Sequence, residues 1–316
     1  MALSIFFLII GIAILIGGAE LLVRGSASIA KRLNISGIVI GLTVVAFGTS
    51  APELVVNLLS AAKGSTELAI SNIVGSNLAN ILLILGIGAS IKILKVKKGT
   101  TYKEIPFALL AIVLVAIMGN DSFLDGTASN IISRTDGIAF LAFFLIFLYY
   151  TFGISRTKGE GESIEKYAWS TSILMFVIGL VALVLGGKWI VDSAIFIAKN
   201  AGLSEGLIGL TIVAIGTSLP ELATTVVALR KGHTDLAIGN VIGSNIFNVF
   251  WILGLTAIIK PIPFNINTNL DVLFTSFATL LLFILIFTGR QHKLRRWQGV
   301  LFIVLYIGYI TFAIIR

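Results

Sequence analysis

Residues 48–54 read GTSAPEL and residues 216–222 read GTSLPEL, and each copy lies inside a long apolar run. Proline breaks a helix because it lacks an amide hydrogen, and a carboxylate is costly to bury among apolar groups. Each motif therefore predicts a broken helix that carries a glutamate beside the break. Because the motif is written twice, the sequence indicates a duplicated fold built around two buried carboxylates.

The composition of the chain points to a membrane. Hydrophobic residues make up 57% and charged residues 12% of the 316 positions, whereas soluble domains carry about 25% charged residues. A helix of roughly 17–25 apolar residues crosses a bilayer. The sequence therefore predicts an all-α, multi-pass protein of the cell membrane with ten transmembrane helices, at about 3–23, 36–62, 68–90, 104–119, 136–152, 168–191, 206–229, 236–259, 270–288 and 297–315.

The charge distribution indicates how the spans are oriented. With the N-terminus outside, 17 Lys and Arg residues fall in the inner loops and 5 in the outer loops, as the positive-inside rule requires. The net charge of +8 is therefore topological, and we expect no nucleic-acid partner. No residue pattern implies a protein partner, and we expect the chain to function as a monomer.

The residue inventory argues against enzyme and redox chemistry. The chain has no cysteine, and its two histidines, His233 and His292, lie in predicted loops. Thiolate metal sites, thiol nucleophiles and histidine-based metal sites inside the bundle are thus excluded. The spans contain neither an HExxH motif nor a pair of aspartates, so we expect neither an enzyme nor a bound cofactor.

The two halves of the chain are copies of one unit at a constant offset of 168 residues. Between 36–54 and 204–222, 13 of 19 positions are identical, and between 66–80 and 234–248, 9 of 15 are identical. Five spans per half force the second copy to enter the membrane inverted, as in many secondary transporters. The predicted organisation is an N-terminal five-helix repeat, a short cytoplasmic linker and an inverted C-terminal five-helix repeat, at 1–152, 153–167 and 168–316, with the repeated core segments at about 36–90 and 204–259.

Oxygen-bearing residues share one face of each repeated helix, at spacings of three or four. The second span places Ala46, Thr49 or Ser50, Glu53 and Asn57 on this face, and the third adds Asn72, Ser76 and Asn80. The corresponding residues of the second half are Ala214, Thr217 or Ser218, Glu221, Thr225, Asn240, Ser244 and Asn248. Carboxylates, hydroxyls, amides and carbonyls freed by proline form a hard-oxygen set, which suits Ca²⁺ and equally suits Na⁺.

Other interpretations of these residues stay open. A single glutamate in an apolar segment can be protonated or bonded to a neighbouring helix, although a charge at the bilayer centre is functional by default. A buried glutamate can also carry a proton, so H⁺/Ca²⁺ exchange is the main alternative, and a cation channel could use the same oxygens. The glycines of the GSN motifs at 75–77 and 243–245 serve helix packing or backbone access.

The paired motifs GTSAPEL…GSNLAN and GTSLPEL…GSNIFN resemble the two α-repeats of the sodium/calcium exchanger family, within the cation/Ca²⁺ antiporters. The chain looks like a short, prokaryotic-type member. The resemblance implies that Glu53 and Glu221 are shared ligands of Ca²⁺ and Na⁺, the transported ions. It further implies three other kinds of ligand. The hydroxyl ligands are those of Thr49, Ser50, Ser76, Thr217, Ser218 and Ser244, and the backbone carbonyl ligands are those of Ala46, Thr49, Ala214 and Thr217. The central amide ligands are those of Asn80 and Asn248.

Potassium-dependent members of this family carry extra acids in these motifs, where this chain has amides, so the resemblance does not imply potassium coupling. We expect alternating access in which Na⁺ and Ca²⁺ compete for Glu53 and Glu221. The resemblance implies an electrogenic exchange of three Na⁺ for one Ca²⁺ that normally extrudes Ca²⁺. The glycine-rich first and sixth spans are expected to move against the other eight. Glu20 and Lys188, at equivalent repeat positions, are expected near opposite membrane faces, where they snorkel to the interface or have local partners and do not pair with each other.

Overall fold

The structure, a computed structural model, describes residues 2–64, 66–124, 126, 129–155, 165–202, 214–288 and 292–315. Within these residues, eight helices are long and apolar enough to cross a membrane, and one bent helix pair passes the same test. The seventh predicted span, at 206–229, begins outside the described residues, and most of the predicted linker also lies outside them. The described helices match the other nine predicted spans in number and order.

The first half of the chain contains five helical spans. They comprise α1 (Ala2–Leu33); α2 (Gly37–Ile40), η1 (Gly41–Val45), α3 (Ala46–Thr49) and α4 (Ala51–Lys63); α5 (Thr66–Leu78), η2 (Ala79–Ile84) and α6 (Leu85–Ile91); η3 (Thr100–Glu104) and α7 (Ile105–Met118); and α9 (Arg134–Ser155). A short helix, α8 (Asp121–Leu124), and the strands β1 (Leu94–Lys95) and β2 (Ile131–Ile132) lie in the connections. The η segments are π-helical.

The second half repeats this order. It comprises α10 (Trp169–Asn200); α12 (Ala214–Thr217) and α13 (Leu219–Arg230); α14 (Thr234–Ile246), η5 (Phe247–Leu253) and α15 (Gly254–Ile259); α16 (Ile266–Phe287); and α17 (Arg296–Ile315). The strands β3 (Ile262–Pro263) and β4 (Lys293–Leu294) pair antiparallel with β2 and β1, respectively. Each strand pair therefore ties a loop of one half to a loop of the other.

The third and eighth predicted spans form the centre of the molecule. The most apolar windows of Thr66–Ile91 and Thr234–Ile259 are 72% and 78% buried, against 22–39% for the other single spans. The outer helices expose large apolar side chains, such as those of Leu145, Ile173 and Val304. Outer helices with apolar surfaces around a buried pair are the arrangement expected in lipid.

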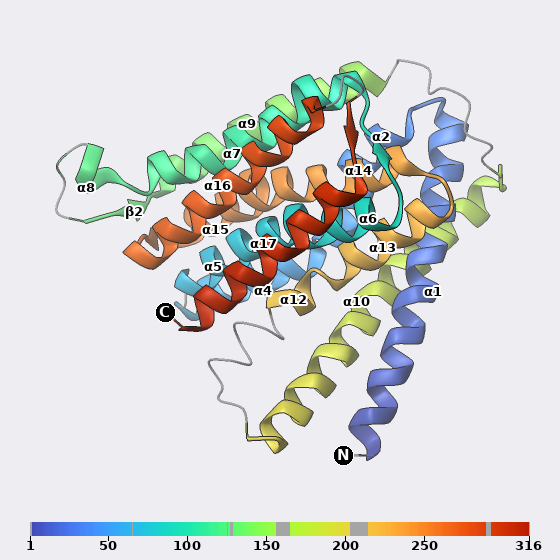
Figure 1. Cartoon of the computed structure of the whole chain (residues 1–316), viewed down its shortest axis with the longest axis horizontal. Coiled ribbons are helices and arrows are strands. Elements are labelled where there is room, and N and C mark those ends of the chain that lie inside the picture. The colour runs from blue at the N-terminus through green and yellow to red at the C-terminus, as the bar shows by residue number, and fades with distance from the viewer. Residues whose placement is uncertain are drawn as a thin grey trace.

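Helices α1 and α10 form a separate antiparallel pair beside this core. Both are 32 residues long, and they lie side by side and project away from the other helices, with the N-terminus at the free end (Figure 1). A Cβ atom on Gly18 would lie 2.9 Å from the Leu183 amide nitrogen, and one on Gly179 would lie 2.5 Å from that of Leu22. Only glycine allows the two backbones to approach this closely.

Candidate ion-binding site

The predicted breaks in the second and seventh spans lie at Ser50 and Ser218. Their backbone angles are φ −83°, ψ 9° and φ −87°, ψ 5°, outside the helical region. Pro52 and Pro220 follow at the start of α4 and α13, where a missing amide hydrogen costs no helical bond. The segments 37–49 and 51–63 meet at 46°. Proline thus ends one half-helix and starts the next, as the motifs predict.

Both glutamates are completely enclosed beside these breaks. Glu53 is 0% and Glu221 1% exposed, and each lies in the first turn of its half-helix. The partial positive charge of a helix N-terminus stabilises a carboxylate there. The preceding half-helices end with their carbonyl groups at the same break, which favours a cation. Each break therefore brings an anchored carboxylate and a negative helix end to one place.

Serine hydroxyls connect each glutamate to the other helices. Ser76 donates to Glu53 Oε1 at 3.3 Å and Ser244 donates to Glu221 Oε1 at 3.4 Å, which are equivalent contacts in the two halves. Ser50 donates to Glu221 across the halves at 3.1 Å, and Ser218 lies 3.2 Å from Ser76. The two carboxyl groups thus belong to one hydroxyl-rich cluster.

The predicted threonines contact asparagines of the opposite half. Thr49 donates to Asn240 Oδ1 at 3.0 Å, and Thr217 donates to Asn72 Oδ1 at 3.3 Å. The Thr49 hydroxyl also lies 3.4 Å from the Ala46 carbonyl oxygen, so Ala46 reaches the cluster through its backbone. Ala214 begins α12, and its side chain lies outside the described ones.

Asn80 and Asn248 lie in the π-helical segments η2 and η5, and a second pair of asparagines orients them. The Asn80 side-chain amide donates to Asn245 Oδ1 at 2.9 Å, and that of Asn248 donates to Asn77 Oδ1 at 3.0 Å. Asn77 and Asn245 are the N of each GSN motif. Neither asparagine is among the predicted ligands, although its presence in both copies of the motif was the available signal.

On the two glutamates and the two central asparagines, four buried oxygen atoms have no hydrogen-bond donor among the described residues: Glu53 Oε2, Glu221 Oε2, Asn80 Oδ1 and Asn248 Oδ1. Asn57 Oδ1, on the predicted face of the second span, also lacks one. A buried oxygen without a partner costs about 1–3 kcal/mol. A cation is the kind of partner that such oxygens lack. Because every ligand is a hard oxygen and none is sulfur or imidazole, the set suits Ca²⁺ or Na⁺ and not a thiolate- or imidazole-seeking metal.

Comparison with known proteins agrees with this chemistry. The family model described as "Sodium/calcium exchanger protein" matches residues 3–153 and 171–315. The putative antiporter CaxA of Alkalimonas amylolytica is 36% identical, covering 98% of each chain. The sodium/calcium exchanger MaX1 of Methanosarcina acetivorans is 30% identical, covering 98% of this chain and 97% of its own.

The fold is likewise similar to that of a solved exchanger. The structure of the sodium-calcium exchanger NCX_Mj soaked with 10 mM Na⁺ and zero Ca²⁺ superposes with a TM-score of 0.84 at 33% identity, covering 98% of each chain. The same exchanger soaked with 2.5 mM Na⁺ and 10 mM Sr²⁺ gives a TM-score of 0.85 at 32% identity. These matches confirm the all-α membrane fold and the resemblance found in the motifs. The chain belongs to the sodium/calcium exchanger protein family.

Proposed function

We propose that this membrane protein exchanges Na⁺ for Ca²⁺, with the two ions bound in turn by Glu53, Glu221, Asn80 and Asn248. The observation that carries the proposal is the set of four buried oxygens, one on each of these residues, that have no donor within the described part of the chain. Two carboxylates and two amide oxygens form part of a Ca²⁺ shell of about 6–8 oxygens. Family membership supports the coarser function, exchange of a cation for Ca²⁺.

The surrounding hydroxyls support Na⁺ as the counter-ion. Each glutamate is flanked by serine oxygens, and Thr49 and Thr217 extend the set toward the opposite half. A proton needs only one carboxylate oxygen, whereas Na⁺ needs several oxygens around it. The proposed Na⁺ ligands are the hydroxyls of Thr49, Ser50, Ser76, Thr217, Ser218 and Ser244 and the carbonyls of Ala46 and Ala214, together with the shared glutamates.

The charge of the cluster supports an electrogenic cycle. Glu53 and Glu221 give a formal charge of about −2, because Asn80 and Asn248 are neutral. One Ca²⁺ neutralises this charge, whereas three Na⁺ leave one positive charge in excess. An inside-negative potential would then drive Na⁺ entry and Ca²⁺ extrusion.

Alternating access would come from the α1–α10 pair moving against the remaining helices. Its close glycine packing favours movement as one body, and its position beside the core (Figure 1) leaves the central helices undisturbed. Ca²⁺ and Na⁺ would bind to the same glutamates in opposite half-cycles. The division of the chain into two inverted repeats, which this mechanism uses, is supported by the equivalent contacts that Ser76 and Ser244 make.

The test is uptake of ⁴⁵Ca²⁺ into proteoliposomes under an imposed Na⁺ gradient or an imposed pH gradient, with the membrane potential clamped in both. Uptake that follows the Na⁺ gradient at constant pH supports the proposal. Uptake that follows the pH gradient and ignores Na⁺ would establish H⁺/Ca²⁺ exchange instead. Flux that needs no ion on the opposite side would indicate a channel.

A further inference from the structure

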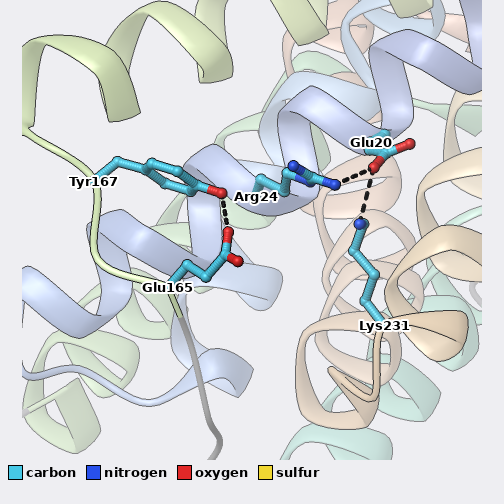
Figure 2. A network of polar contacts seen from close by, with 5 residues as sticks. All are labelled: Glu20, Arg24, Glu165, Tyr167 and Lys231. Carbon is cyan, nitrogen blue, oxygen red and sulfur yellow. Dashed lines mark hydrogen bonds and ion pairs between the residues drawn. The ribbon is translucent and has the colours of Figure 1, made fainter.

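An ion pair joins α1 to the core. Glu20, in the middle of α1, accepts hydrogen bonds from Arg24 at 2.6 Å and from Lys231 at 2.9 Å, both at Oε1 (Figure 2). Arg24 belongs to α1 itself, but Lys231 follows α13, which carries Glu221. The Glu20–Lys231 pair is thus a direct charge contact between the α1–α10 pair and a half-helix of the ion site.

The two long helices are fixed to each other on the same side of the molecule as this ion pair. The Ser28 and Ser172 hydroxyls lie 2.8 Å apart, and the Tyr167 amide donates to Ser28 at 3.0 Å. Arg32 donates to the Tyr167 carbonyl and lies over the ring of Trp169. A displacement of α1 and α10 against α13 therefore leaves these contacts in place and breaks the Glu20–Lys231 pair.

The residues of the other half that correspond to Glu20 and Lys231 are both lysines, so they cannot form an ion pair with each other. At the offset of 168 residues, Glu20 corresponds to Lys188, Arg24 to Asp192 and Lys231 to Lys63. Exchanging the conformations of the two halves, which inverted repeats allow, would bring position 188 to position 63 at the opposite face. In the arrangement of this structure Glu20 meets Lys231, whereas in the exchanged arrangement Lys188 would meet Lys63. Within the described residues, neither Lys188 nor Lys63 has an acidic side chain at ion-pair distance.

We propose that Glu20 and Lys231 are positioning residues that make the apparent affinity for Ca²⁺ differ between the two faces of the exchanger. Their ion pair holds the ion-free carrier closed at the face whose loops carry most of the Lys and Arg residues, the lysine- and arginine-rich face. Within the described residues, Lys188 and Lys63 form no matching ion pair at the other face. The inference rests on the alternating-access mechanism proposed above, but not on Na⁺ being the counter-ion. Neither residue touches the transported ion, so both act through the helices that they join.

This arrangement affects apparent affinity in a specific way. When only a fraction of carriers exposes the site to one face, the apparent dissociation constant at that face rises by the inverse of the fraction. The ion pair lowers the fraction open to the lysine- and arginine-rich face, and therefore raises the KM for Ca²⁺ there. The Lys231 and Glu20 side chains are 26% and 43% exposed, so we expect an effect of about two- to fivefold, as for other solvated ion pairs.

The test uses Ca²⁺/⁴⁵Ca²⁺ self-exchange in right-side-out and everted membrane vesicles, which reports the Ca²⁺ KM at each face without Na⁺ or a pH gradient. We expect Glu20→Gln and Lys231→Gln each to lower KM about two- to fivefold at the lysine- and arginine-rich face and to change it little at the other. Lys231→Arg should keep the wild-type values. The double variant should match the single ones, because both remove the same contact.

Lys188→Glu is the mirror experiment, because it places a carboxylate where the exchanged arrangement meets Lys63. By favouring closure at the opposite face, it should act like Glu20→Gln and lower KM at the lysine- and arginine-rich face by a similar factor. Glu67→Gln, which removes an exposed acid in the first turn of α5, is the matched control and should leave both values unchanged. Equal changes at the two faces, or none in Glu20→Gln and Lys231→Gln, would overturn the inference. Absence of self-exchange in the wild type would instead count against the proposed transport function.

Discussion

The side chains of Asn77 and Asn245 exchange hydrogen bonds, each amide donating to the backbone carbonyl of the other at 3.3 Å. The two residues occupy equivalent positions in the halves, so the contact lies where the two repeated helices meet. Their side-chain Oδ1 atoms accept hydrogen bonds from the side-chain amides of Asn80 and Asn248. Each central amide nitrogen is thereby occupied, whereas Asn80 Oδ1 and Asn248 Oδ1 have no hydrogen-bond donor among the described residues.

We therefore predict that Asn77→Ala and Asn245→Ala raise the KM for Ca²⁺ about tenfold, although neither residue is a proposed ligand. Loss of the acceptor leaves a buried amide donor unpaired, which costs about 1–3 kcal/mol, and allows the central amide to rotate. The measurement is ⁴⁵Ca²⁺ transport together with the melting temperature. Asn120 and Asn269, which exchange side-chain hydrogen bonds at 3.2 and 2.8 Å away from the cluster, provide the control. Asn120→Ala should affect only stability, and an equal KM change there would contradict the role of Asn77.

Glu53→Gln and Glu221→Gln should each abolish Ca²⁺ transport and leave expression and folding nearly intact. A glutamine keeps the size of the side chain and its hydrogen bond from Ser76 or Ser244, but it removes the charge that binds the ion. Both transport and size-exclusion behaviour of the purified protein should be measured, with Glu67→Gln as the control. Near-normal exchange in either variant would remove that residue from the ion site.

The broken helices and their glutamates could be predicted from the sequence because proline and a buried acid both violate the rules for an apolar helix. The orientation of Asn80 and Asn248 could not, since it depends on Asn77 and Asn245 of the opposite halves. Helical spacing places residues on a face but does not say which amide atom faces inward. The π-helical segments η2 and η5 have no comparable sequence signal. The extent of α1 to Leu33 was also missed, because hydropathy reports only the lipid-embedded part.

Ser76→Ala and Ser244→Ala should weaken the dependence on Na⁺ more than Ca²⁺ binding. A neutral hydroxyl supplies a larger share of the ligation of a monovalent ion, whereas Ca²⁺ relies mainly on the carboxylates. Na⁺ activation and Ca²⁺ affinity should be measured on the same preparations. Ser90→Ala, which removes a hydroxyl bonded to the Gly86 carbonyl, is a control outside the cluster. Equal losses for both ions would argue against separate Na⁺ positions.

Exchange of three Na⁺ for one Ca²⁺ should move one charge per cycle. The flux would then respond to voltage with roughly 2.3 kcal/mol per 100 mV. Na⁺-driven Ca²⁺ flux should therefore change when liposomes are clamped at different potentials with K⁺ and valinomycin. Flux that ignores the clamp would imply two Na⁺ per Ca²⁺ and an electroneutral cycle.

The central claim is that Ca²⁺ and Na⁺ compete for one pair of buried carboxylates. Equilibrium ⁴⁵Ca²⁺ binding to the purified protein, titrated with Na⁺ at constant pH and ionic strength, tests it without transport. We predict steep displacement of Ca²⁺ by Na⁺, because several Na⁺ ions replace each Ca²⁺, and loss of Ca²⁺ binding in Glu53→Gln and Glu221→Gln. Ca²⁺ that stays bound at high Na⁺ and leaves only on acidification would contradict the claim.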